Sequence, residues 1–194
     1  HVLLLDFSAP DGPHVQPRPW YPSVAGLELL VVDTRTRHAN ADGAFAARRT
    51  EGELAMALTP DALSTTPDTL LRRRRHVETE NERVRAVAKA SGNDDWRAVG
   101  HHLTASHHSL RSDYEVSTDV LDTTVEAALA GGAWGARMTG AGFGGSVVVL
   151  SPVDSRADLI ASVTSAALRA GHRAPRFLSG NASGPATRIR VAGP

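Results

Sequence analysis

The stretch Gly135-Ala136-Arg137-Met138-Thr139-Gly140-Ala141-Gly142-Phe143-Gly144-Gly145 decides how the rest of the sequence is interpreted. Four glycines in the six positions 140–145 allow one backbone to approach another backbone or a ligand closely, and successive N–H groups can form an anion-binding concavity. The β-branched run at 146–150 predicts a strand immediately afterwards. The stretch therefore predicts a glycine-rich turn that leads into a strand.

Two common phosphate-binding loops do not fit this turn. Gly140, Gly142 and Gly145 satisfy the dinucleotide fingerprint formally, but that fingerprint requires a helix after the turn. A P-loop requires a Gly-Lys-Ser/Thr sequence, and the only lysine of the chain, Lys89, is far from the turn. Two alternatives stay open at this point, a backbone that approaches a ligand and a tight β-connection without one.

The composition excludes several functional classes. The 194 residues carry 21 Lys plus Arg and 21 Asp plus Glu, so no net charge attracts nucleic acid or an anionic membrane. No apolar run approaches the ~20 residues of a membrane-spanning helix, which predicts a soluble chain. The absence of cysteine excludes a disulfide framework, a thiolate zinc site and a thiol nucleophile, and is typical of a reducing compartment.

Apolar runs, prolines and helical spacing predict the remaining elements. Apolar runs predict buried strands at 2–6 and 26–33, and the proline-rich residues 10–22 predict a loop or an edge strand. Helical spacing predicts five helices, which begin near residues 42, 66, 93, 117 and 155. Further strands are expected at 147–150, 175–179 and 187–191. The chain begins at His1 and enters an apolar run at once, which favours a fragment or a processed chain.

Charged and histidine-rich stretches on the predicted helices do not form an obvious chemical site. The run of four arginines at 72–75 lies near three glutamates at 78–82, a pattern typical of a solvated, ion-paired helix face and not of a nucleic-acid patch. Four histidines share one helix, but no pair has the spacing of metal ligands: His101, His102, His107 and His108. His107 lies on the apolar stripe, which favours a hydrogen-bonded packing role. Ser109 does not lie in a nucleophile elbow, so hydrolase chemistry has little support.

Four stretches in series resemble the motifs of one family, the GHMP small-molecule kinases, in the form that galactokinases carry. The glycine-rich stretch 135–145 is similar to the third motif of that family. The other stretches agree in order and spacing: Val31-Val32-Asp33-Thr34 followed by Asp42-Gly43-Ala44-Phe45-Ala46-Ala47-Arg48-Arg49, then Arg75-His76-Val77-Glu78-Thr79-Glu80-Asn81-Glu82-Arg83-Val84, then His107-His108-Ser109-Leu110-Arg111-Ser112-Asp113-Tyr114-Glu115-Val116-Ser117. The resemblance covers nearly the whole chain.

The resemblance implies an α+β fold, in which an antiparallel sheet packs with helices as in the carboxy-terminal domain of a GHMP kinase. Residues 1–34 are expected to be strands of the amino-terminal catalytic lobe, and residues 35–194 are expected to form the carboxy-terminal domain. The implied reaction is transfer of the γ-phosphoryl group of ATP, with Mg²⁺, to the anomeric hydroxyl of galactose. The complete enzyme is expected to be cytoplasmic and monomeric, without nucleic-acid or membrane partners.

Part of the machinery of that reaction is expected outside this chain. The first motif of the family, its nucleotide loop and its catalytic aspartate all precede the region that matches here. Because phosphoryl transfer depends on these parts for positioning and charge neutralisation, residues 1–194 alone are expected to be inactive. The Mg²⁺ ligands are expected in the amino-terminal half as well.

The resemblance also assigns site residues, none of them catalytic. The turn is expected to line the cleft near the transferred phosphate through Thr139, Gly140, Ala141, Gly142, Phe143, Gly144 and Gly145, and Gly142→Val is expected to obstruct that cleft. Phe45 stands where the family usually has a tyrosine that contacts the sugar, so it is expected to pack against the sugar without that hydrogen bond. Four further polar residues are expected to hold elements together: Arg48, Arg49, Asn81 and Arg137.

Two alternatives remain beside a galactokinase. Phe45 favours a non-catalytic relative that binds or senses a sugar, because kinase-like scaffolds can be reused for regulation. Another GHMP kinase, with a different small-molecule substrate, would carry the same motifs.

Overall fold

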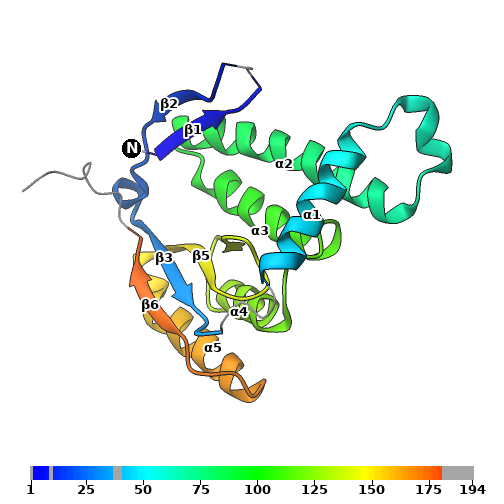
Figure 1. The fold of residues 1–194 in the computed structure, drawn as a ribbon. Helices are drawn as coiled ribbons and strands as arrows, with labels where there is room; N and C mark the ends of the chain where they lie inside the picture. The colour runs from blue at the N-terminus through cyan, green and yellow to red at the C-terminus, as the bar shows by residue number, and fades with distance from the viewer. Residues whose placement is uncertain (1, 9–10, 37–40, 181–194) are drawn as a thin grey trace, which may run out of the picture.

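The computed structural model describes residues 2–8, 11–36 and 41–180. Strands β4, β5, β3 and β6 form a four-stranded sheet in that order, and β1 and β2 form a separate two-stranded sheet (Figure 1). Their pairings are antiparallel, which confirms the predicted α+β class. The elements are β1 (Val2–Asp6), β2 (His14–Arg18), β3 (Leu27–Asp33), α1 (Ala41–Met56), α2 (Asp68–Gly92), α3 (Trp96–Ser112), α4 (Asp119–Ala130), β4 (Gly135–Thr139), β5 (Ser146–Pro152), α5 (Arg156–Arg169) and β6 (Arg176–Ser179), with 3-10 turns at Pro22–Ala25, Pro60–Thr65 and Val153–Ser155. The strand expected at 187–191 lies outside the described residues.

The five helices begin within three residues of their predicted starts. Thr66 does not cap α2, because its hydroxyl donates a hydrogen bond to the carbonyl of Ala62. Asp95 caps α3 by accepting the N–H of Ala98 at 3.0 Å. Among the described residues, none of these helices has both the length and the apolarity needed to cross a membrane.

The four-stranded sheet buries one face under α4 and α5. Leu30 and Val32 of β3 are fully buried on this face, because alternate residues of a strand point to the same side. In register beside them lie Val149 and Val147 of β5. The helices contribute Leu121, Val125, Leu159 and Val163 to the same core cluster. The apolar residues of β3 and β5 therefore contribute to this main core.

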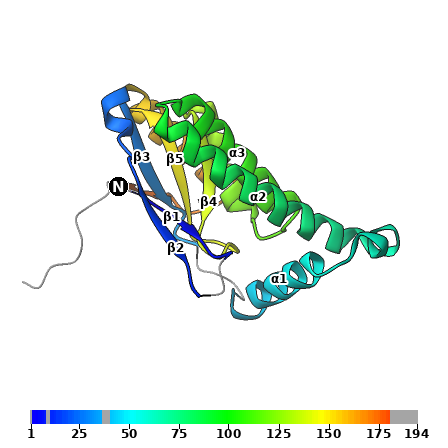
Figure 2. The same cartoon turned by 90° about the horizontal axis from the view of Figure 1, so that it is seen from above.

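A second, smaller core joins α2 and α3 to one end of the sheet. Leu27 and Leu150 pack there with Trp96 and Val99 of α3. Trp20, in the segment that leads from β2 to β3, meets the Trp96 ring edge-on with centroids 5.1 Å apart. Figure 2 shows α2 and α3 side by side along the sheet, with α1 folded back beside the first part of α2. The three tryptophans of the chain all belong to this cluster or pack against it, so their fluorescence reports its integrity.

The β1–β2 hairpin differs from the prediction that residues 2–6 are a buried strand. Leu3, Leu5 and Phe7 are 60%, 45% and 71% exposed, since no second layer covers this face within the described residues. The proline-rich segment does supply an edge strand, because β2 contains Pro17 and, among the residues that the structure describes, pairs with β1 alone.

The strand β3 lies inside the four-stranded sheet, with β5 on one side and β6 on the other. The boundary expected at residue 34 therefore does not coincide with a break in the sheet. Membership of an amino-terminal lobe stays a prediction for residues 1–34, of which β3 pairs with β5 and β6.

The helix α3 covers the outer edge of β4. The backbones touch at Gly100 and Gly135, where a Cβ on Gly135 would lie 2.0 Å from the Gly100 carbonyl oxygen. Farther along, the Ala136 N–H donates to the Thr104 hydroxyl at 3.3 Å. In this way α3 supplies hydrogen-bond acceptors for N–H groups of the edge strand β4. Unpaired N–H groups on an edge strand could otherwise pair with another chain.

The contact between α3 and β4 predicts a large cost for a methyl group at Gly100. A Cβ there would lie 2.4 Å from the carbonyl oxygen of Trp134, so Gly100→Ala is expected to lower the free energy of unfolding by about 3 kcal/mol. Gly92→Ala is the matched helical control, because no atom lies within 4 Å of its Cβ, and it should be neutral or slightly stabilising. Urea titration followed by tryptophan fluorescence measures both. Equal stability of the two variants would contradict this assignment.

Candidate functional site

The glycine-rich turn between β4 and β5 has a backbone that requires glycine at several positions. Successive residues 142–145 have positive φ angles of 84°, 60°, 133° and 92°, and Gly140 has a φ of 85°. Phe143 is the member of this run that carries a side chain, and it packs partly buried against the main core. The prediction of a glycine-rich turn that leads into a strand is confirmed, and a left-handed backbone explains its composition.

Two anchors hold this turn to the domain. On one side, Thr34 donates its N–H and its hydroxyl to the Gly145 carbonyl, at 3.0 and 2.6 Å, and Thr36 accepts the Gly145 N–H. On the other side, the Phe143 N–H donates to the Val116 carbonyl at 2.8 Å. Thr34 is 1% exposed, so the first anchor is protected from water. The turn is thus fixed at its far end to β3 and at its middle to the link between α3 and α4.

Gly140 and Gly142 face different surroundings. A Cβ on Gly142 would lie 2.3 Å from the Val116 carbonyl oxygen, so this glycine is required by packing within the domain. No atom lies within 4 Å of a Cβ on Gly140, which is exposed together with Thr139. Gly142→Val is therefore expected to disturb the packing of the turn against Val116, and its effect on a cleft stays a prediction. Gly142 is the packed position, and Gly140 is the position that is open to another molecule.

Phe45 lies in the first half of α1 and is 39% exposed. Figures 1 and 2 both show α1 beginning close to the β4–β5 turn. The inward side of α1 uses small residues, because a Cβ at Gly52 would lie 3.7 Å from the Tyr114 ring and Ala55 is fully buried. The structure leaves the Phe45 ring partly accessible and brings its helix to the same side of the domain as the turn.

Charged groups make the other contacts of α1. Arg73 of α2 is 1% exposed, and its Nε donates to Glu51 of α1 at 2.7 Å while its Nη2 donates to Glu115 at 2.6 Å. Its Nη1 donates to the Asp113 carbonyl. Arg48 of α1 bonds Glu51 at 3.0 Å and lies 3.8 Å from Glu115. The prediction that the arginine run at 72–75 is a solvated face is therefore wrong for Arg73, although the prediction of ion pairing is confirmed.

Mutual pairing shifts the pKa values of this cluster. The hydrogen bond from Arg73 lowers the pKa of Glu115 below its ordinary value. Burial acts to raise the pKa of Glu51, but Arg73 and Arg48 outweigh it and the net shift is downward. Burial acts against the charge of Arg73 too, and its two carboxylate partners still raise its pKa. The cluster therefore stays ionised at neutral pH.

Two buried histidines, His76 and His107, bond to neighbouring elements. His76 of α2 is 7% exposed, contacts the Ser109 hydroxyl through Nδ1 at 3.0 Å and stacks on Tyr114. Burial lowers the pKa of His76. His107 of α3 accepts the Met138 N–H through Nδ1 at 3.4 Å. The prediction that His107 is a hydrogen-bonded packing residue is confirmed.

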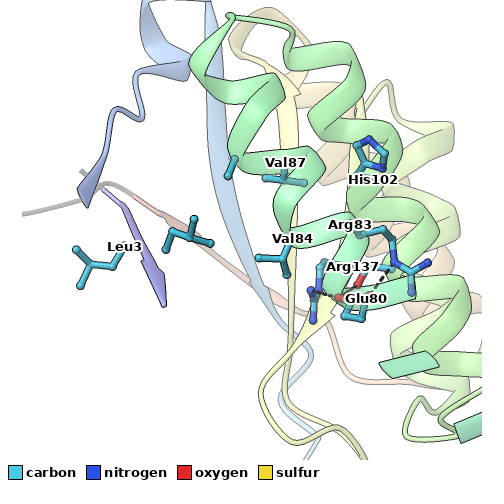
Figure 3. Close-up of a pocket in the computed structure, with 10 residues that line it drawn as sticks. Leu3, Glu80, Arg83, Val84, Val87, His102 and Arg137 are labelled. Carbon is cyan, nitrogen blue, oxygen red and sulfur yellow. Dashed lines mark hydrogen bonds and ion pairs between the residues drawn. The ribbon is translucent and has the colours of Figure 1, made fainter. Parts of the chain in front are cut away.

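A small cavity of about 180 Å³ lies between the β1–β2 hairpin and α2 (Figure 3). Its apolar walls include Leu3 and Val84, and its polar side contains Glu80, which bonds both Arg83 and Arg137. Burial lowers the pKa of Arg137, and its pair with Glu80 ties β4 to α2.

Of the four residues expected to hold elements together, two do so clearly. Arg137 joins β4 to α2, and Arg48 joins α1 to the α3–α4 link. Arg49 pairs with Glu53 of its own exposed helix surface, so it does not join elements through that ion pair. Asn81 is exposed on α2 and lines a second pocket, which lies between α2 and the β1–β2 hairpin.

Three functional residues were not predicted by the sequence interpretation: Thr34, Arg73 and Glu115. Arg73 and His76 are three residues apart and share one face of α2, so helical spacing could have indicated that this arginine points inward. No local signal marks Glu115, because its role depends on α1 and α2. Among the described residues, no group of three or more His, Asp or Glu side chains could hold a metal ion.

Comparison with known proteins places this geometry in a family. Residues 86–170 match the family model described as GHMP kinases C terminal. The structure aligns with Lactococcus lactis galactokinase complexed with galactose at a TM-score of 0.72 and 27% identity, over 86% of this chain and 47% of that chain. It aligns with L. major mevalonate kinase at a TM-score of 0.58 and 18% identity, over 91% and 47%, which supports the fold alone. Both the matched residues 86–170 and the aligned fold correspond to the carboxy-terminal domain of GHMP kinases.

Within that family the sequence is similar to galactokinases. It is 40% identical to the Mycobacterium tuberculosis galactokinase over 187 residues, covering 90% of this chain and 51% of the relative. It is 41% identical to the Streptomyces coelicolor galactokinase over 179 residues, covering 84% and 46%. The chain therefore spans about half the length of the curated relatives that it matches.

The turn predicts different costs for two glycines that have nearly the same φ. Gly140→Ala should lower stability by about 1–2 kcal/mol, through the left-handed backbone alone. Gly142→Ala should add about 1–3 kcal/mol to that cost, because its Cβ meets the Val116 carbonyl. Urea denaturation of both variants gives the difference directly. If the two variants unfold at the same urea concentration, the turn does not pack on Val116 as described.

The lowered pKa of His76 predicts how stability depends on pH. Because the folded-state pKa lies below the ordinary value of 6.5, the folded chain binds this proton less readily than the unfolded chain. Stability should therefore be complete above pH 6.5 and decrease as the pH falls through and below that value. His76→Phe keeps a ring against Tyr114 and should flatten this dependence between pH 7.5 and about 5. An unchanged slope in the variant would exclude His76 as the cause.

Proposed function

We propose that this chain is the carboxy-terminal part of a galactokinase, which transfers the γ-phosphoryl group of ATP to the anomeric hydroxyl of galactose. The observation that carries the proposal is 40% identity with galactokinases across 90% of the chain. The glycine-rich turn and the α1 helix, which begin on the same side of the domain, support it. Within the proposal, ATP and galactose are the substrates.

In this reaction the residues of the chain would act by positioning. Phosphoryl transfer requires little covalent chemistry from the protein, and catalysis comes mainly from orientation and charge stabilisation. Gly140 and Thr139 would present a small, exposed backbone to the phosphate side of the cleft. Phe45 would lie against the face of the sugar. The anchors at Thr34 and Val116 would keep the turn from moving during transfer.

The parts that the described residues do not supply are proposed to come from an amino-terminal half. The described residues include no metal-holding group, so Mg²⁺ and the catalytic groups would be held there. The exposed apolar face of the β1–β2 hairpin would pack against that half. The complete enzyme would act as a cytoplasmic monomer, and residues 1–194 alone would be inactive.

A second candidate function is favoured by one residue. Phe45 has no hydroxyl to donate to a sugar, and a site that lacks a polar contact discriminates less well between substrates. A sugar-binding protein without kinase activity would tolerate this change. The same experiment distinguishes it from the first proposal.

The test compares residues 1–194 with a fusion in which the amino-terminal half of the Mycobacterium tuberculosis galactokinase precedes them. We expect ADP formation that depends on galactose from the fusion and none from residues 1–194, because positioning needs both halves. A coupled assay with ATP, Mg²⁺ and galactose measures both. Phe45→Tyr in the fusion should lower the KM for galactose up to about tenfold, as expected for one added hydrogen bond.

Three outcomes would contradict the proposal. Substantial turnover by residues 1–194 would show that the second half is not required. A folded fusion that binds galactose by calorimetry but transfers no phosphate would support the sugar sensor instead. Transfer to another alcohol in a substrate panel, and none to galactose, would indicate a different kinase of the family.

A further inference from the structure

Glu115 combines an unfavourable backbone with strong side-chain contacts. It lies in the link between α3 and α4 with a φ of 56°, a left-handed conformation that a residue with a Cβ adopts only at a cost. Its Oε1 accepts from Arg72 at 2.6 Å, and its Oε2 accepts from Arg73 at 2.6 Å. The two arginines hold the carboxylate in place and so maintain the strained backbone.

The side chain of Glu115 is connected to α1 through Arg73. Arg73, which bonds Glu115, also bonds Glu51 of α1 at 2.7 Å, and Arg48 of α1 bonds Glu51 in turn. Arg48 lies one helical turn after Phe45. Because Gly52 and Ala55 offer little apolar area on the inward face of α1, these ionic contacts contribute much of what fixes the helix.

The backbone of Glu115 is connected to the glycine-rich turn through the next residue, Val116. Val116, the next residue, accepts the Phe143 N–H at 2.8 Å, and its carbonyl would touch any Cβ on Gly142. Val116 is 2% exposed, so this contact is firmly packed. A movement of Glu115 therefore displaces both the support of α1 and the support of the turn.

We propose that Glu115 is a positioning residue, which fixes the helix that carries Phe45 at a set distance from the glycine-rich turn. The mechanical link is a property of this chain. Only its meaning for catalysis, as the spacing between sugar and transferred phosphate, rests on the proposed function. An error of about 1 Å in such a spacing is enough to slow transfer by about a hundredfold.

The chain itself allows a direct test, because it contains no cysteine and accepts site-specific labels. Spin labels at Ala47→Cys on α1 and Ala157→Cys on α5 report the distance between the two helices, and both positions are exposed. Glu115→Gln should at least double the width of that distance distribution. It should also raise the hydrogen-exchange rate of the Phe143 amide about tenfold, while tryptophan fluorescence stays unchanged.

The matched control is Glu53→Gln. Glu53 forms an exposed ion pair with Arg49 within α1, and this ion pair does not involve α2. The control substitution should leave both the distance distribution and the Phe143 exchange rate as in the parent chain. If Glu115→Gln also leaves them unchanged, the proposal is wrong. If Glu53→Gln broadens the distribution as much, α1 responds to any loss of charge and the specific role of Glu115 is refuted.

The kinetic readout uses the active fusion and separates positioning from folding. Glu115→Gln and Glu115→Gly should both lower kcat for galactose at least tenfold, with the KM for ATP unchanged within twofold. Glycine removes the backbone strain, so a merely structural role predicts that it restores stability and kcat together. Restored kcat in Glu115→Gly would overturn the proposal. An inactive unsubstituted fusion would instead refute the proposed function, and the label distances would still decide the role of Glu115.

Discussion

The close approach of residues 135–142 to α3 and to the link that follows it is the constraint on which the rest of the domain depends. Two backbone contacts, at Gly135 and at Gly142, leave no room for a Cβ. Between them, Thr104 and His107 accept N–H groups from the outer edge of β4. Because a packed interior deforms little, these contacts leave α3, β4 and the turn one relative position. The core beneath α4 and α5 is then built on β5, the partner strand of β4.

The position of α1 depends on a different kind of interaction. An apolar helix face can slide, because hydrophobic contact has no direction, whereas charge-assisted hydrogen bonds fix both distance and orientation. Arg73 engages Glu51, Glu115 and a backbone carbonyl with its three nitrogens, so its burial is matched by partners. Such a cluster adds little net stability, because desolvation of the charges is costly. Its effect is to specify where α1 lies.

The sequence predicted the elements well because they depend on local patterns. Helical spacing, the apolar run of β3 and the glycines of the turn are all encoded within a few residues of where they act. His107 was predicted correctly for the same reason, since it lies on an apolar stripe. The burial of Arg73 was not predicted, because the charged run was interpreted as one solvated face and its partners Glu51, Asp113 and Glu115 lie 22 to 42 residues away in the sequence. The prediction that β1 is buried was wrong. Apolar composition indicates that a strand is suited to burial, but it does not show whether the described residues pack over it. The expected role of Phe45 stays a prediction.

The β1–β2 hairpin has an exposed apolar face, which bears on how the domain would work within a larger protein. Its exposed leucines and Phe7 form an apolar surface that a domain of this size does not leave uncovered without a use. The segment that leads from the hairpin to β3 is fixed to the domain, because Trp20 packs on Trp96 and the Val153 N–H donates to the Gly26 carbonyl next to β3. β3 ends at Asp33, and the next residue, Thr34, anchors the glycine-rich turn, so a lobe docked on the hairpin would be tied to the turn through this strand. The same strand that joins the sheet would then set the spacing between the two halves of a kinase.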